Sequence, residues 1–198
     1  MFNFKLIDFI MINEEIKEKN LSIFLKKLEE IGVNVEINES KLNLIKNATF
    51  AISNENGLAY EGSLLNVILR ILTPFAIKIN DALPENIRVD KNSLIKVCLL
   101  SNISKCEMFE PNDNEWEKEK RGLLFKYTKS NVALKMGMKS LIFAQELGVK
   151  FTPEEIEAMT IMDRRLDDEQ TMFFSNPISV VLKQAHELTY LSTRLINK

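Results

Sequence analysis

Histidine and acidic side chains set the limits on what chemistry this chain can perform. His186 is the one histidine among 198 residues. A catalytic serine or cysteine with an imidazole base would have to use His186, and no sequence motif places such a nucleophile beside it. Metal sites built on imidazole need several convergent ligands. We therefore expect His186 to be a partly buried helix residue rather than a metal ligand.

The one compact carboxylate cluster is the segment DRRLDDEQ at 163–170. Its aspartates, Asp163, Asp167 and Asp168, have the oxygen donors that a hard cation such as Mg²⁺ prefers. Arg164 and Arg165 lie among them, which favours a solvated surface run with local charge pairing. The surface interpretation is preferred, and a magnesium site is the alternative.

The sulfur-containing residues also have two interpretations. Cys98 and Cys106 lie in or beside an apolar segment, without the second cysteine pair of a zinc site. Buried free thiols are expected, which suits a reducing cytoplasm. Four methionines, Met136, Met138, Met159 and Met162, raise the question of copper(I), but methionine more commonly fills gaps in cores.

Charge and hydropathy exclude other classes of protein. Lys and Arg number 26 against 28 Asp and Glu, for a net charge of −2. This balance argues against general binding to nucleic acid or acidic membranes. Asp8 interrupts the apolar N-terminus, and no signal cleavage site follows. The longest apolar stretch, 67–77, is judged too short to span a bilayer. We expect a cytoplasmic protein with no membrane association.

Helical periodicity dominates the rest of the chain. The spacing of apolar residues predicts a long helix with a kink or an end near Pro74, and Asp90 is expected to cap another. Thr152 and Glu155 form the pattern of a capping box. The helices are expected over 20–32, 62–79, 91–105, from Thr152 onward, and over 177–195.

Other segments suggest loops or strands. Residues 33–60 are mixed, with short β-like pieces, and 109–121 are charged and turn-rich, which predicts a surface loop. Residues 122–128 have strand character and are expected to pair with the following VALKM as a hairpin. The predicted fold is mainly α, a helical bundle with a minor β-hairpin.

Four segments, in this order, resemble small HD-superfamily proteins of bacterial and phage origin. They are AYEGSLL (59–65), CLLSNISK (98–105), KMGMKSLIFAQELGVKFTPEEIEAM (135–159) and PISVVLKQAHELTYL (177–191). The resemblance implies an HD-like helical domain over 59–198. It leaves 1–58 as an N-terminal extension, which we expect to pack on the bundle.

Members of this superfamily hold metal ions through four histidines and two aspartates, and the metal activates water against a phosphate ester. The resemblance places these positions at Val67, Ser101, Asn102, Met136, Met162 and His186. None keeps the family residue, which implies a vestigial pocket without metal or cofactor. Ser101 and Asn102 have two interpretations. They could bind a ligand through hydrogen bonds or, as we favour, form hydrogen bonds with neighbouring residues inside the bundle.

Lys139 and Ser140 retain the family's Lys-Ser step at a helix start, where a phosphate could rest, and are therefore candidate anion contacts. The preferred hypothesis is a catalytically inactive HD-like domain that acts as a binding, regulatory or scaffold protein, with a protein partner or a small ligand. One alternative is a phosphohydrolase with a rebuilt magnesium site at Asp163, Asp167 and Asp168. Another is a structural component of a phage particle or other assembly, docking through the apolar N-terminus.

Overall fold

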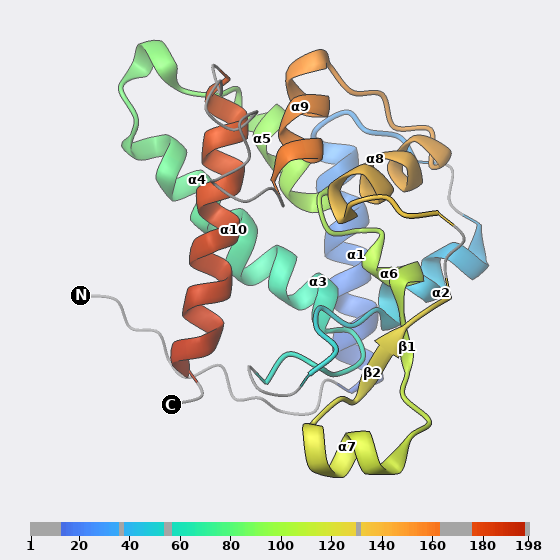
Figure 1. Ribbon diagram of the computed structural model, residues 1–198. Helices are drawn as coiled ribbons and strands as arrows, with labels where there is room; N and C mark the ends of the chain where they lie inside the picture. Colours follow the sequence, from blue (N-terminus) through green and yellow to red (C-terminus); the bar gives the residue numbers. More distant parts are fainter. Residues whose placement is uncertain (1–12, 36–37, 54–56, 130–131, 163–175, 197–198) are drawn as a thin grey trace.

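The computed structural model describes residues 13–35, 38–53, 57–129, 132–162 and 176–196 (Figure 1). Its architecture is mainly helical with one two-stranded sheet, which confirms the predicted fold class. In chain order the elements are α1 (Glu14–Glu30), α2 (Glu39–Asn47), α3 (Ser63–Val67), η2 (Ile68–Leu72), α4 (Thr73–Ala82), η3 (Glu85–Ile87), α5 (Lys91–Leu100), α6 (Lys105–Met108), β1 (Phe109–Pro111), α7 (Glu115–Arg121), β2 (Phe125–Tyr127), α8 (Met136–Glu146), α9 (Pro153–Ile161) and α10 (Pro177–Ile196).

A shared apolar core joins helices from both ends of the chain. Helix α10 runs along one side of the molecule and packs against α9 and α4 (Figure 1). Phe24 and Leu28 of α1 have no exposed surface, and neither do Leu99 of α5 or Leu182 of α10. These residues belong to one cluster. Burial of apolar surface therefore binds the early helices to the later ones.

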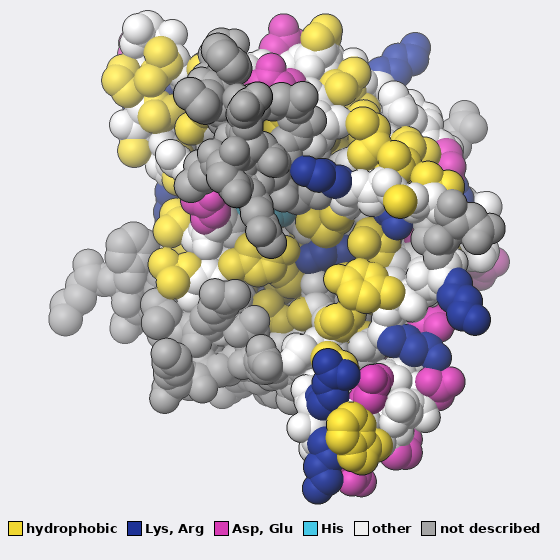
Figure 2. All heavy atoms as spheres, viewed as in Figure 1, with side chains coloured by type: hydrophobic (Ala, Val, Ile, Leu, Met, Phe, Trp, Pro, Cys, Tyr) yellow, Lys and Arg dark blue, Asp and Glu magenta, His cyan; other side chains and the backbone are white. Residues whose placement is uncertain are grey.

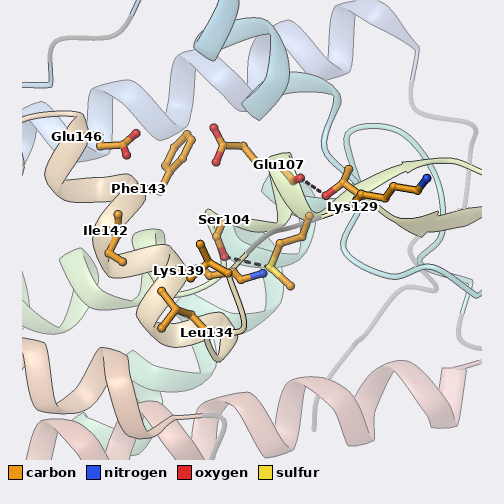
Figure 3. Close-up of a pocket in the computed structure, with 11 residues that line it drawn as sticks. Ser104, Glu107, Lys129, Leu134, Lys139, Ile142, Phe143 and Glu146 are labelled. Atoms are coloured by element: carbon orange, nitrogen blue, oxygen red, sulfur yellow. Dashed lines mark hydrogen bonds between the residues drawn. The ribbon is translucent and has the colours of Figure 1, made fainter.

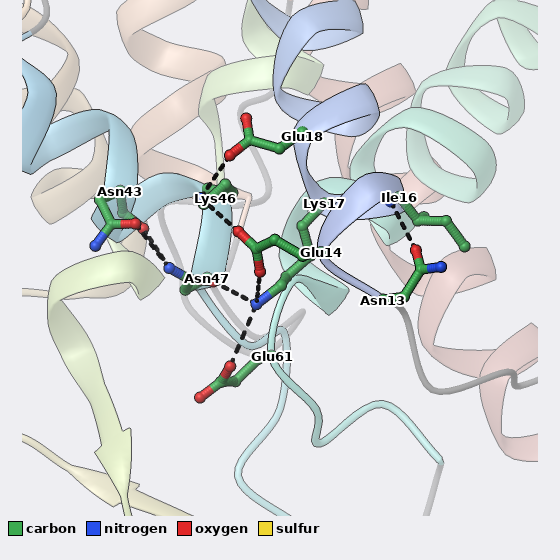
Figure 4. Close-up of polar contacts among 9 residues, drawn as sticks. All are labelled: Asn13, Glu14, Ile16, Lys17, Glu18, Asn43, Lys46, Asn47 and Glu61. Carbon is green, nitrogen blue, oxygen red and sulfur yellow. Dashed lines mark hydrogen bonds and ion pairs between the residues drawn. The ribbon is translucent and has the colours of Figure 1, made fainter.

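Polar contacts fasten α1 to α2 and to the turn before α3 (Figure 4). Lys17 Nζ lies 2.8 Å from Glu14 and 2.7 Å from the Asn47 side chain, and it reaches Glu61 at 3.4 Å. Lys46 contacts the same Glu14 carboxylate at 2.6 Å. Lys17, and next Lys46, lower the pKa of Glu14 to about 2. The carboxylates of these pairs are more than half exposed, so each pair is individually weak and the main effect is to orient α1 on α2.

Residues Ser63–Ala82 form one continuous helix of 20 residues, and Pro74 does not end it. A π-helical turn, η2, precedes the proline, and the Thr73 N–H donates to the Ile68 carbonyl five residues earlier. The wider turn accommodates a residue that cannot donate its own N–H. By length and composition this helix could cross a membrane, since it is longer than the apolar stretch 67–77 that by itself is too short to do so. More than half of its apolar window, 56%, is buried inside the protein.

The charged segment 109–121 is not a loop throughout, because it contains a strand and a helix. The strand predicted within 122–128 forms, but it pairs with 109–111 and not with the VALKM segment that follows it. Strand β1 pairs antiparallel with β2, with Phe109 opposite Tyr127, and α7 lies between the two strands. The Asn114 side chain accepts from Glu117 N–H to begin α7, and Gly122, at φ 62°, ends it. Figure 2 shows the charged side chains that surround α7 at the lower end of the molecule.

The β-like pieces expected within 33–60 are mostly absent from the part of that segment that the structure describes. Asn38 caps α2 there, and Ser53 makes one isolated bridge to Leu123. The other predicted helices are confirmed, with Asp90 capping α5, which stops at Leu100 instead of reaching residue 105. Thr152 and Glu155 form the complete capping box of α9.

Candidate functional site

Ser101 and Asn102 meet His186 in the protein interior. Ser101 caps the end of α5 and Asn102 lies in the turn that follows, while His186 projects from α10. His186 Nε2 lies 3.1 Å from Ser101 Oγ and 3.4 Å from Asn102 Nδ2. Neither Ser101 nor Asn102 has any exposed surface, and His186 is 4% exposed. Three of the six predicted former ligand positions therefore form one hydrogen-bonded group, the His186 cluster.

The His186 cluster is uncharged at neutral pH. Burial lowers the pKa of His186 to about 3, and the nearby Lys105 contributes in the same direction. The Asn102 Oδ1 atom is buried and has no hydrogen-bond partner among the described residues. Each member of the cluster is thus a neutral polar group, and the Asn102 side-chain oxygen has no hydrogen bond to offset its loss of hydration.

Lys105, which the sequence did not single out, brings an amine to the same region. It begins α6, and its Nζ donates to the Phe50 carbonyl at 2.9 Å and lies 3.5 Å from the centre of the Phe50 ring. Tyr190 of α10 faces the same amine at 5.8 Å. Among the described residues no carboxylate pairs with it, and burial lowers the pKa of Lys105 to about 7. The apolar context of CLLSNISK was the available signal, because a lysine within a buried turn loses its hydration.

The remaining former ligand positions serve packing. Val67 of α3 has no exposed surface, and Met162 at the end of α9 is 5% exposed. Met136 begins α8 half-buried against the same core. Its carbonyl accepts from Ser104 Oγ at 3.4 Å, which is a polar contact with the start of α6. The gap-filling interpretation of these methionines agrees with their places in the core.

In the part of the chain that the structure describes, acidic side chains do not form a metal-binding group. No group of three or more His, Cys, Asp and Glu side chains there lies close enough to hold a metal ion. Asp163, Asp167 and Asp168, with Arg164 and Arg165, fall outside the described residues. Cys98 and Cys106 are both buried free thiols, as expected. Burial raises the pKa of Cys106 to about 12, which makes it a poor nucleophile at neutral pH.

Lys139 and Ser140 face different surroundings. The Ser140 hydroxyl is fully buried, lies 2.8 Å from Ser104 Oγ and accepts from the Ser104 N–H at 3.2 Å. Lys139 instead lines a surface pocket of about 480 Å³, shown in Figure 3. A phosphate cradle that uses both side chains is therefore not formed, because the serine is committed to α6.

No protein-family model, curated protein or solved structure matches this chain.

Proposed function

We propose that this protein is a catalytically inactive HD-like helical domain of the cytoplasm that acts as a binding or scaffold module for a protein partner or small ligand. The observation that supports this most directly is the His186 cluster. The positions that would carry metal ligands hold Ser101, Asn102 and the single imidazole of His186 instead.

Electrostatics argue against a divalent cation at this centre. A metal ion in a buried site needs anionic or strongly donating ligands to offset its lost hydration. The His186 cluster has no carboxylate, and the Lys105 amine lies close enough to affect the pKa of His186. Whenever Lys105 carries its proton, it would repel a divalent cation there in a medium of low dielectric constant. Metal-activated water, on which hydrolysis in the HD superfamily depends, is therefore disfavoured.

Metal analysis of the full chain tests this proposal. Purified protein is dialysed against Mn²⁺, Fe²⁺, Ni²⁺ or Mg²⁺, its metal content is measured, and it is screened against nucleotides and phosphodiesters. We expect substoichiometric metal and no hydrolysis above that of a matched Ser101→Ala/Asn102→Ala variant. Stoichiometric metal that this double substitution removes would overturn the proposal.

The same screen separates the alternative enzyme from the inactive domain. Magnesium-dependent activity that is lost in Asp163→Ala/Asp167→Ala, but kept in Ser101→Ala/Asn102→Ala, would replace the proposal with a rebuilt site in 163–170. A matched Glu115→Ala/Glu119→Ala variant on the charged helix α7 also removes two negative charges and controls for nonspecific effects of changing surface charge.

A further inference from the structure

The segment 109–127 forms an arm that extends away from the helical bundle (Figure 1). Strands β1 and β2 make up its length, and helix α7 is its far end. Trp116 is the one hydrophobic residue of α7, and it is 61% exposed. Figure 2 shows hydrophobic surface among the charged side chains at this lower end of the molecule. Tryptophan is among the residue types that most often dominate the affinity of a protein interface, so the end of the arm is suited to docking.

The base of the arm borders the pocket beside Lys139, which Figure 3 shows. Met108, which precedes β1, and Thr128, which follows β2, both line this pocket. The Thr128 N–H donates to the Met108 carbonyl at 2.9 Å, so the pocket wall is continuous with the two-stranded sheet. The hydrogen-bonded strands hold the pocket and α7 apart, and Trp116 therefore cannot fill the pocket of its own chain.

Exposed hydrophobic side chains gather around the pocket. Val132, Leu134 and Ile142 are each more than a third exposed, and all three line it. Ile142 is three residues after Lys139 on α8, so hydrophobic surface and an ammonium share one face of that helix. The pocket volume of about 480 Å³ is typical of small-molecule sites and is ample for one aromatic side chain. Clustered apolar surface of this kind marks an interaction site.

Charge distinguishes the two ends of the pocket. Lys41 pairs with Glu146 at 3.0 Å, so the acidic end already has an ammonium from this chain. Lys139 lies apart from Glu107 and Glu146 (Figure 3), and no carboxylate within the described ranges pairs with it. The pocket thus presents apolar surface beside an unpaired ammonium. Its complement is a hydrophobic side chain with a carboxylate next to it.

Helix α7 carries this complement. Glu119 is three residues after Trp116, so the two side chains are neighbours on the surface of α7. Glu115 and Glu117 each form an ion pair within the helix. Glu119 has no ion pair in the part of the chain that the structure describes, and its carboxylate is available to a lysine of another molecule.

We propose that two copies of this chain form a symmetric dimer, in which Trp116 of each copy occupies the pocket of the other and Glu119 pairs with Lys139. A two-fold axis that crosses the arms between α7 and the pocket places each α7 on the other copy's pocket, so one contact implies the second. Two such contacts make a small interface, and we expect micromolar affinity. The inference goes beyond the proposed function, and its site is separate from the His186 cluster.

Tryptophan fluorescence tests the contact, because Trp116 is the one tryptophan of the chain. The full chain is studied from about 1 to 500 µM by analytical ultracentrifugation and by emission spectra with acrylamide quenching. We expect a dimer that forms with increasing concentration, while the emission shifts to shorter wavelength and quenching falls in parallel, because the indole leaves water. A monomer throughout this range, or a dimer whose indole stays exposed, would overturn the proposal.

Substitutions at the two ends of the arm assign the contact. Trp116→Ala should weaken dimerisation at least about tenfold, as expected for a residue that dominates an interface. Ile87→Ala is the matched control, because it removes an exposed hydrophobic side chain from η3, outside the arm and the pocket, and it should change nothing. A control variant that weakens dimerisation as much as Trp116→Ala does would exclude this contact.

Exchange of the two charges tests the ion pair. Lys139→Glu and Glu119→Lys should each weaken dimerisation, because each places like charges together. The double variant, which exchanges the charges, should regain most of the lost affinity. If it regains none, Glu119 does not face Lys139 and the proposed arrangement is wrong. Urea unfolding of each variant verifies that its fold is intact.

A mixture of two defective chains separates this contact from one between the two α7 helices. Trp116→Ala keeps the pocket and Ile142→Asp keeps α7, so a mixed dimer has one intact contact of tryptophan with pocket. We expect the mixture to associate more tightly than either variant alone, and no gain on mixing would show that Trp116 docks elsewhere. Metal binding at the His186 cluster would contradict the proposed function and leave these results unaffected.

Discussion

Single residues at the centre of this protein combine deep burial with incomplete pairing. Asn102 keeps an unsatisfied amide oxygen among the described residues, and burial holds His186 neutral. The Lys105 amine contacts the Phe50 carbonyl and the rings of Phe50 and Tyr190. Unsatisfied buried polar groups lower stability relative to well-paired ones. The pH dependence of unfolding should therefore report on the two titratable members, His186 and Lys105.

His186 should make the protein less stable as the solution is acidified below pH 6.5. Its pKa is about 3 in the folded protein and near 6.5 when unfolded, so the unfolded chain binds the extra proton in this interval. Between pH 6.5 and 5 the loss amounts to about 2 kcal/mol. Urea unfolding of wild type and His186→Gln at pH 7.5, 6.5 and 5 measures it. The difference in free energy of unfolding between wild type and His186→Gln should change by this amount between pH 6.5 and 5. If the two proteins lose stability in parallel, His186 is not the group that causes the loss.

Lys105 should make the folded protein more stable as the pH rises above 7. Its pKa of about 7 lies below the unfolded value of 10.5, so the unfolded chain holds more protons between these pH values and stability rises as pH rises. From pH 7 to 9 the gain is about 2 kcal/mol. Lys105→Met, which keeps the length and removes the amine, should abolish this rise and be more stable than wild type at pH 7. A wild-type profile that is flat over this range in urea unfolding would show that Lys105 keeps its proton in the folded state.

At the scale of helices and strands, the sequence predicted those features that depend on contacts between residues close together in the chain. The capping box of α9 could be predicted because Thr152 and Glu155 contact each other within one turn. The sequence did not reveal that the buried Glu155 also binds Ser93 and Lys96 of α5, since those partners are about sixty residues away. The convergence of Ser101 with His186 could be expected only from the resemblance. The surface pocket beside Lys139 depends on tertiary contacts that no spacing in the sequence encodes.

Gly137 shows how packing between helices can require a residue for which the local sequence gives no reason. A Cβ atom at this position would lie 1.9 Å from the Met159 carbonyl oxygen, so α8 and α9 approach too closely for any side chain. We expect Gly137→Ala to force the helices apart and cost about 1–3 kcal/mol or more. Urea unfolding checks this, with the exposed Gln145→Ala on the same helix as a control that should be nearly neutral. An unchanged midpoint for Gly137→Ala would mean that α9 shifts freely.

At the scale of the whole molecule, the helix Ser63–Ala82 admits two environments, a bilayer or the protein core. Its length and composition suit either. Leu64, Ile68 and Leu72 have no exposed surface, and the helix packs against α5 and α10. Insertion into a bilayer would require these contacts to be broken. Each fully buried aliphatic side chain contributes about 1.5–3 kcal/mol to the folded state.

We therefore predict that the folded chain stays in the aqueous phase. In flotation with neutral and with anionic phospholipid vesicles, the protein should remain at the bottom of the gradient. Arg70→Leu, which makes the exposed side of the helix more apolar, should behave identically because the buried side is unchanged. Gly137→Ala provides the informative contrast, since loosening the bundle frees apolar surface and should increase the floating fraction. The prediction is contradicted if wild-type protein floats with the vesicles and still shows a cooperative unfolding transition. The helix would then contact lipid in the native state, and its composition rather than its burial would determine its environment.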